Sequence, residues 1–189
     1  MNNKETNIEE TKEAKAEEGE VRLKKVTRII GEYALIAAVV IIIFKCLLMI
    51  TFVPSESMED TIRTGDMILC TRFDAKKIDR YDIMVFKAPD EDVYYIKRVI
   101  GLPGETITVE NGKVYADGKE LDSSFIKEEM DNSGNGIFEV PDNCYFMMGD
   151  NRNNSYDSRF WDSHYVPIDN FVSHARFVIY PLNYIGLLK

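Results

Sequence analysis

A run of twenty residues from Tyr33 to Phe52, with Lys45 as its single charge, constrains the fold of this chain most. As an α-helix, about twenty residues rise roughly 30 Å, which is the thickness of the hydrocarbon core of a bilayer. A lysine costs about 2.5–3.5 kcal/mol at the centre of such a helix. Lys45 lies past the midpoint, and its aliphatic stem lets the ammonium reach the interface. We therefore predict a transmembrane helix over residues 29–53.

The segments on either side of this run indicate how the helix is oriented. A cleaved secretory signal is the alternative, because Val53-Pro54-Ser55 offers the small residues of a cleavage site, but the long polar leader and the over-long apolar stretch favour an uncleaved anchor. Four basic residues precede the run, and acidic residues follow it: Arg22, Lys24, Lys25 and Arg28, then Glu56, Glu59 and Asp60. This asymmetry predicts a single-pass protein of the plasma membrane with a cytoplasmic N-terminus and residues 54–189 outside the cytoplasm.

Residues 1–28 contain seven basic and seven acidic side chains, and residues 1–20 show no apolar periodicity. We interpret this segment as a disordered cytoplasmic tail, or at most a frayed polar helix. The formal charge of −9 therefore lies on residues 29–189, which hold 16 basic and 25 acidic side chains. An acidic body argues against nucleic acid as a partner, because such binding depends on neutralising phosphates.

The three cysteines, Cys46, Cys70 and Cys144, lack the spacing of metal ligands. Neither a metal nor a cofactor is therefore expected. Cys70 and Cys144 could form a disulfide if the domain lies outside the cytoplasm, but the sequence does not show that they meet.

Beyond residue 60 the sequence favours strands. Asn111-Gly112 and Asp117-Gly118 predict hairpin turns, and the polar stretch from Asp122 to Gly136 predicts a loop. The short apolar runs are Met67 to Cys70, Ile83 to Phe86, Val93 to Ile100, Ile107 to Val109, Cys144 to Met148 and Phe177 to Tyr180. The predicted fold class is mainly β, an antiparallel and partly closed β-sheet domain preceded by one N-terminal transmembrane helix.

Ser57, four residues beyond Val53, and Lys97, in an apolar strand, suggest a nucleophile and its base. A lysine acts as a general base only when burial lowers its pKa from about 10.4 to roughly 7–8. Lys97 shares one strand face with Val93, Tyr95 and Val99, and Arg98 shares the other with Ile96 and Ile100. Parity does not decide which face is the core, although only the lysine can release its proton. The alternative is an ordinary edge-strand lysine.

Three motifs occur in order behind the anchor: PSESMEDTI from residue 54, YIKRVIGLPGE from residue 95 and GDNRNNSYDSR from residue 149. Together they resemble the boxes of bacterial type I signal peptidases, membrane-bound Ser-Lys proteases that remove signal peptides from exported proteins. The resemblance covers residues 50 to 180, approximately.

The resemblance implies a role for each matching residue. Ser57 would be the nucleophile and Lys97 its base, with the Ser57 backbone N–H and the Ser55 hydroxyl as the oxyanion hole. Ser155 would orient the lysine amine. Asp157 and Arg159 would form an ion pair that supports this side of the site. The residues implied in shallow pockets for small substrate side chains are Val53, Met58, Ile62, Tyr95 and Ile96. Cleavage would follow an Ala-x-Ala pattern, and the partners would be signal-peptide-bearing preproteins and membrane lipid.

The sequence departs from this family at Asp60, where proline is usual, and at Glu56, where a small residue is common. Glu56 is expected to face solvent, because a carboxylate pointed inward would oppose an oxyanion. Ser173-His174 replaces a frequent Gly-Lys pair, and Phe160 to Pro167 is longer and more polar than usual.

The same residues allow other interpretations. A calcium loop starting at Asp150 lacks its central glycine and closing glutamate, and a Ser-His-Asp enzyme would need His164 or His174, which lie in no motif. A related Ser-Lys protease, such as a LexA-like regulator or an organellar inner-membrane peptidase, and a non-catalytic membrane-anchored β-domain that binds partner proteins are the remaining alternatives.

Overall fold

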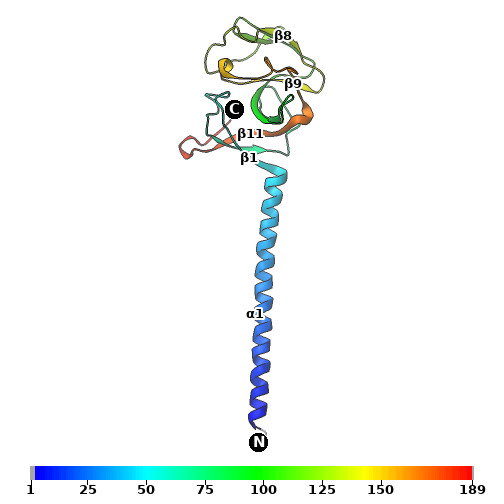
Figure 1. The fold of residues 1–189 in the computed structure, drawn as a ribbon, viewed down its shortest axis with the longest axis vertical. Helices are drawn as coiled ribbons and strands as arrows, with labels where there is room; N and C mark the ends of the chain where they lie inside the picture. The colour runs from blue at the N-terminus through cyan, green and yellow to red at the C-terminus, as the bar shows by residue number, and fades with distance from the viewer. Residues whose placement is uncertain (1–2, 189) are drawn as a thin grey trace. The chain divides into compact units, whose positions relative to one another are not determined.

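The computed structural model describes residues 3–188, and these divide into two units between Lys45 and Cys46. The first unit consists of the long helix α1 (Asn3–Ile42), and a π-helical turn (Ile43–Leu47) follows it (Figure 1). The second unit contains all of the β-strands described, so the predicted fold class is confirmed: mainly antiparallel β, with one apolar helix at the N-terminus.

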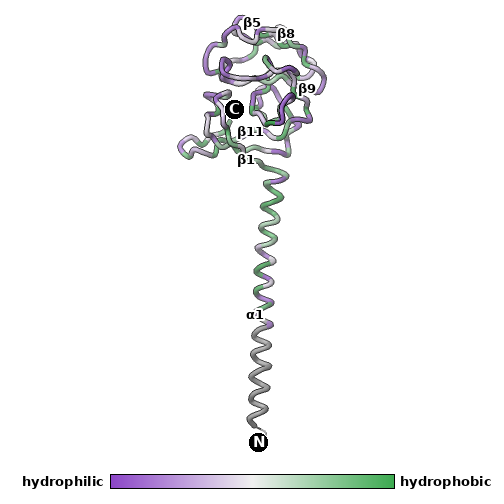
Figure 2. The backbone as a smooth tube through the Cα atoms, viewed as in Figure 1, coloured by the Kyte–Doolittle hydropathy of each residue, from purple (hydrophilic) through white to green (hydrophobic). Residues whose placement is uncertain are grey.

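The segment long and apolar enough to cross a membrane runs from Arg22 to Leu47, 26 residues that would rise about 39 Å as a straight helix. Its large side chains are exposed, and Figure 2 shows the apolar residues gathered along this half of α1. Such a surface fits a transmembrane anchor, because exposed apolar side chains are stable in lipid and costly in water.

The segment predicted as a disordered tail, residues 1–28, is helical from Asn3 onward. Alanine, glutamate and lysine favour helices, which explains why the backbone is regular without an apolar face. Pairs four residues apart add to this where side chains are described: Lys24 Nζ lies 2.9 Å from Glu20 Oε1, and Arg28 Nε lies 3.0 Å from Glu32 Oε1.

The anchor helix ends earlier than predicted. Residues 48–53 were assigned to the helix, but Leu48–Phe52 form strand β1, which pairs with β2 (Met67–Thr71) from Leu48 opposite Thr71 to Phe52 opposite Met67. These residues are apolar and suit both a helix in lipid and a strand in a protein core. Backbone pairing with a strand distant in sequence decides between them, as is common for short apolar runs.

The larger sheet of the second unit has the strand order β1-β2-β11-β3-β4-β9-β10, with β12 paired to β11, and all of its pairs are antiparallel. Its further members are β3 (Ile83–Lys87), β4 (Tyr94–Gly101), β9 (Cys144–Met148), β10 (Val166–Pro167), β11 (Phe171–Tyr180) and β12 (Gly186–Leu187). Strand β4 lies between β3 and β9, so Lys97 is not on an edge strand.

The smaller sheet has the order β7-β6-β5-β8 and lies beside β9 at the top of Figure 1. It consists of β5 (Thr106–Glu110), β6 (Lys113–Ala116), β7 (Lys119–Glu120) and β8 (Gly136–Glu139). Both predicted hairpin turns are confirmed: Asn111 and Gly112 have φ of 50° and 75°, and Asp117 and Gly118 have 50° and 76°. The predicted loop fills most of the stretch between β7 and β8.

Both faces of β4 are buried, which answers the question that parity left open. Ile96 packs at the edge of one core cluster, Val99 belongs to a second and Ile100 to a third. Lys97 and Arg98 are consequently 3% and 1% exposed. Short 3-10 turns complete the unit at Arg152–Asn154, Ile168–Asn170 and Leu182–Tyr184. Cys46, Cys70 and Cys144 are free, so Cys70 and Cys144 do not form a disulfide here.

Candidate active site

The serine motif is held in place by the third motif of the sequence. The backbone N–H of Asn151 donates to the Ser57 carbonyl at 3.1 Å, and the Asn151 side-chain amide donates to the Glu56 carbonyl at 3.0 Å. On the other side, the Val53 N–H donates to Asp66 O at 3.0 Å. These bonds fix the peptide groups on both sides of the Ser57 hydroxyl.

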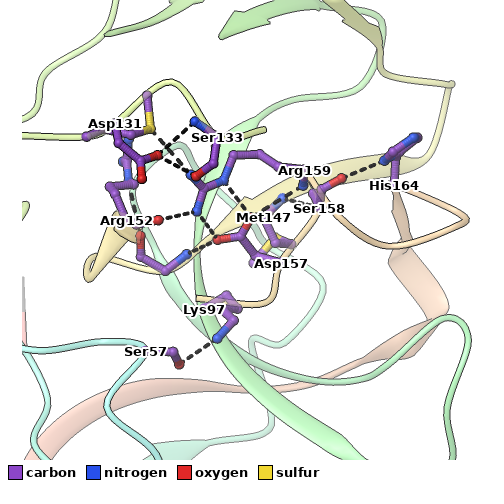
Figure 3. A network of polar contacts seen from close by, with 12 residues as sticks. Ser57, Lys97, Asp131, Ser133, Met147, Arg152, Asp157, Ser158, Arg159 and His164 are labelled. Atoms are coloured by element: carbon purple, nitrogen blue, oxygen red, sulfur yellow. Dashed lines mark hydrogen bonds and ion pairs between the residues drawn. The ribbon is translucent and has the colours of Figure 1, made fainter. Parts of the chain in front are cut away.

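Lys97 and Ser57 meet inside the second unit. The Lys97 amine lies 2.5 Å from Ser57 Oγ, which is hydrogen-bonding distance, and both residues are buried, at 3% and 8% exposure (Figure 3). The hydroxyl of Ser55 lies 3.4 Å from Ser57 Oγ. A nucleophile in contact with a lysine is the arrangement that activates a serine without histidine.

Burial changes the acid–base behaviour of the lysine. Removal from water lowers the pKa of Lys97 to about 8; the Asp157 carboxylate opposes this, Arg159 adds to it, and Asp150 also opposes it. At that pKa about one lysine in ten is neutral at pH 7, against about one in 2,500 at the ordinary value. The amine can therefore accept a proton near neutral pH.

An ion pair forms the wall beyond the lysine. Arg159 Nε donates to Asp157 Oδ1 and Nη2 donates to Oδ2, both at 2.9 Å, and the two side chains are fully buried (Figure 3). Burial alone would raise the pKa of Asp157, but the bonds from Arg159 outweigh it and hold that pKa below its ordinary value. A second buried pair joins the lysine motif to the third motif, where Arg98 donates to both oxygens of Asp150 at 2.8 and 2.7 Å.

Gly149 and Ser155 lie directly behind the serine. A Cβ atom built on Gly149 would overlap with the Ser57 carbonyl oxygen and with Ser155 Oγ, so only glycine fits. Ser155 is 8% exposed, and its hydroxyl has no hydrogen-bond partner among the described residues. The expected bond from Ser155 to the Lys97 amine is thus not formed in this structure.

A groove of about 320 Å³ opens onto the Ser57–Lys97 pair. The residues that line it include Ser55, Tyr95 and Ile96, together with Phe52, Val93 and Tyr94. It is mainly apolar and open at one side, as a site for an extended peptide would be.

Comparison with known proteins identifies the family of this chain. The family model "Signal peptidase, peptidase S26" matches residues 26–180, which is most of the chain. This chain belongs to that family.

Two relatives show how far the similarity extends. A signal peptidase I of Leptolyngbya laminosa is 37% identical over 147 residues, 72% of this chain and 71% of that protein. A probable signal peptidase I-2 of Synechocystis sp. is 37% identical over 145 residues, 72% of this chain and 65% of that protein. A solved signal peptidase I from Enterococcus faecalis is 27% identical, with a TM-score of 0.45 over 51% of this chain and 95% of that one. Family membership makes this S26 peptidase a serine endopeptidase.

The structure of this S26 peptidase distributes the predicted pocket residues unequally. Tyr95 and Ile96 line the groove, whereas Val53, Met58 and Ile62 are 1%, 0% and 0% exposed and lie in the core cluster that includes residues of β2, β3 and β11. Glu56 faces solvent, as expected, and its carboxylate accepts from the Asn154 amide at 3.1 Å.

The two histidines of this S26 peptidase contact other groups than Ser57. His164 Nδ1 lies 2.7 Å from the Ser158 carbonyl oxygen, and His174 lies between Asp74 and Asp82. Among the side chains of Glu20 and residues 22–188, which the structure describes, no three of His, Cys, Asp or Glu gather where they could hold a metal ion.

Three contributors to the site were missed at the sequence level: Gly149, Asn151 and Trp161. Gly149 and Asn151 belong to the third motif. The order of the three motifs in the chain indicates a shared site, but it predicts no role for these two residues. Trp161, 2% exposed, stacks on Tyr95 with ring centroids 5.9 Å apart and planes 8° apart. No periodic pattern in the sequence signals that contact.

Proposed function

We propose that this protein is a membrane-bound endopeptidase that removes N-terminal signal peptides from exported preproteins, with Ser57 and Lys97 as a catalytic dyad. The observation that carries the proposal is the 2.5 Å contact between the buried Lys97 amine and the Ser57 hydroxyl. The lowered pKa of Lys97 supports it, because a base must be neutral to accept the serine proton.

In the proposed mechanism, neutral Lys97 takes the proton of Ser57 as Oγ attacks the scissile carbonyl. The negative charge that forms on the carbonyl oxygen is stabilised by the Ser57 N–H and the Ser55 hydroxyl, and donors of this kind contribute about 2.7–4 kcal/mol each. Protonated Lys97 then gives its proton to the leaving amine, and the acyl group stays on Ser57. Water, deprotonated by Lys97, releases the acyl group and restores the hydroxyl.

Ser155 is proposed as a positioning residue for the Lys97 amine. Its buried hydroxyl has no other partner among the described residues, so rotation toward the amine would break no existing bond. Hydrogen bonds of catalytic groups often tighten only when substrate is bound.

The proposed substrate carries small residues before the scissile bond, in the Ala-x-Ala pattern. Tyr95 and Ile96 support this as groove-lining residues. Val53, Met58 and Ile62 would act from beneath by filling the floor so densely that large side chains find no space.

The proposed location is the plasma membrane, with the N-terminus in the cytoplasm, residues 54–189 outside it, and lipid as a partner. The four basic residues before the apolar run support this orientation. Apolar side chains are exposed on neighbouring strands, where Phe52 pairs with Met67 and Met67 with Tyr180. β1 follows the anchor directly in the chain, which supports lipid contact for this surface.

The test is cleavage of a preprotein bearing an Ala-x-Ala signal by the full chain in detergent micelles, with the new N-terminus identified by mass spectrometry. Wild type should cut after the second alanine, and Ser57→Ala and Lys97→Ala should not cut. His164→Ala is the matched control and should remain active. Cleavage by either dyad variant, or none by a folded wild type, would refute the assignment.

A further inference from the structure

Glu91 lies on the turn between β3 and β4 and lines the same groove as Ser57 and Lys97. Among the described residues that line this groove, Glu91 and Lys97 are the charged ones. Lys97 is buried at the catalytic end, whereas Glu91 is exposed. The groove therefore presents one accessible anion in a mainly apolar wall.

The two acidic neighbours of Glu91 are engaged elsewhere. Asp92 pairs with Lys87 Nζ at 2.8 Å, and Asp90 accepts from the Ser163 hydroxyl and, at 3.2 Å, from its N–H. Among the side chains that the structure describes, those of Glu20 and of residues 22–188, none forms an ion pair with Glu91. Of these three consecutive acids, the middle one alone lines the groove.

One hydrogen bond sets the position of the Glu91 carboxylate. The hydroxyl of Tyr95 donates to Glu91 Oε2 at 3.1 Å, and the Tyr95 ring is held by stacking on the buried Trp161. The Lys97 amine lies 5.8 Å from the centre of that ring. A carboxylate accepts about four hydrogen bonds, so the tyrosine leaves most of its capacity for a ligand.

We propose that Glu91 determines specificity by favouring substrates with a lysine or arginine side chain near the scissile bond. This inference rests on the proposed peptidase function and adds a charged contact to it. The long aliphatic stem of such a side chain would lie along Val93 and Tyr94, with its cationic head at Glu91. A glutamate at the same substrate position would be repelled.

The expected preference is modest, because Glu91 is exposed and solvent screens its charge. Pairs of this kind change equilibrium and rate ratios by about two- to five-fold. A competition between two substrates in one reaction measures such a ratio directly, since enzyme concentration and detergent act equally on both.

The experiment uses the full chain in detergent micelles and peptides that share one neutral Ala-x-Ala sequence. Lys, Gln or Glu is placed in turn at each position from the fifth residue before the scissile bond to the third after it, the two alanines excepted. Lys and Gln peptides compete, and mass spectrometry gives the ratio of their kcat/KM values. Wild type should prefer Lys by about two- to five-fold at one position.

Three variants distinguish the charge of Glu91 from other effects. Glu91→Gln should bring the ratio to about 1, Glu91→Lys should turn the preference toward Glu, and Asp92→Asn, on the same turn, should keep the wild-type ratio. Raising the salt concentration should reduce the wild-type ratio. An equal ratio in wild type and Glu91→Gln at every position would overturn the inference, whereas failure of wild type to cut the neutral peptide would count against the proposed function itself.

Discussion

The α-carbon of Gly149 lies against the carbonyl oxygen of Ser57, and no methyl group fits between them. The same missing Cβ would overlap with Ser155 Oγ. Because the neighbouring Asn151 N–H also donates to that carbonyl, the third motif fixes the serine peptide through backbone groups. The position of the nucleophile thus depends on a residue that contributes no chemistry of its own.

Gly149→Ala should therefore lower kcat/KM by about 100-fold or more, because a shift of about 1 Å in a nucleophile has that effect. Overpacking should also lower the free energy of unfolding by about 1–3 kcal/mol. Peptide cleavage and urea denaturation measure the two effects. Gly186→Ala is the matched control, since nothing lies within 4 Å of its added Cβ. If Gly149→Ala cleaved the peptide at the wild-type rate, the backbone at Ser57 would be able to shift without loss of activity.

The pH dependence of cleavage should follow the ionisation of Lys97. Its pKa of about 8 predicts that kcat/KM rises tenfold per pH unit below pH 8 and levels off above it. Lys97→Arg should be inactive across this range, because arginine keeps its proton. Rates between pH 5.5 and 9.5, with circular dichroism to verify folding, measure the profile. A flat profile from pH 6 to 9, or an active Lys97→Arg, would mean that Lys97 acts through its charge.

The same burial should make the wild type less stable than a variant without the amine. The pKa of Lys97 falls from 10.5 unfolded to about 8 folded, so the folded state binds fewer protons between these values. Stability consequently rises with pH from 8 to 10.5, and the penalty is full below pH 8. Lys97→Met, of similar length, should be inactive and about 3 kcal/mol more stable at pH 7. The stability gain should shrink as the pH approaches 10.5; an unstable Lys97→Met would indicate that the amine contributes net stability.

Much of this architecture could be predicted from the sequence, and the misses have physical causes. The hairpin turns and six of the twelve described strands were predictable, because Asn-Gly and Asp-Gly turns and short runs of β-formers act locally. Strand β1 was not predictable, because its apolar residues suit a helix in lipid equally well. Only the pairing with β2 decides between helix and strand. Which face of β4 is buried was not predictable either. The alternation of residues along a strand cannot reveal that core clusters cover both of its sides.

The candidate site was likewise predictable only in part. The contact between Ser57 and Lys97 followed from the motifs, because three boxes in order specify a shared site. The burial of Val53, Met58 and Ile62 in a core cluster, and not on the groove surface, did not follow. A motif identifies residues near a site, but the depth of each side chain depends on how β2, β3 and β11 pack.

His174, on β11, hydrogen-bonds one loop carboxylate and lies close to a second, and the ionisation of these carboxylates should affect stability in acid. Its Nε2 lies 3.1 Å from Asp82 Oδ2 and its Nδ1 lies 3.3 Å from Asp74 Oδ1. Burial tends to raise the pKa of both carboxyls, but hydrogen bonds from His174 to Asp82, and from Thr71 and Arg176 to Asp74, outweigh it and lower both pKa values. These bonds therefore stabilise the fold above the ordinary aspartate pKa of about 3.9, and the contribution is lost as pH falls through the lowered values.

Asp82→Asn should accordingly reduce the free energy of unfolding by about 1–3 kcal/mol at pH 7, because it removes a charge that accepts a hydrogen bond from a buried partner. The difference from wild type should shrink below about pH 4 as the wild-type carboxyl takes up its proton. Urea denaturation at a series of pH values measures both quantities. Asp169→Asn is the matched control, since that carboxylate is almost fully exposed beside Lys76 and should change stability little at any pH. A deficit in Asp82→Asn that stays constant down to pH 2 would assign the loss to packing and not to the carboxylate charge.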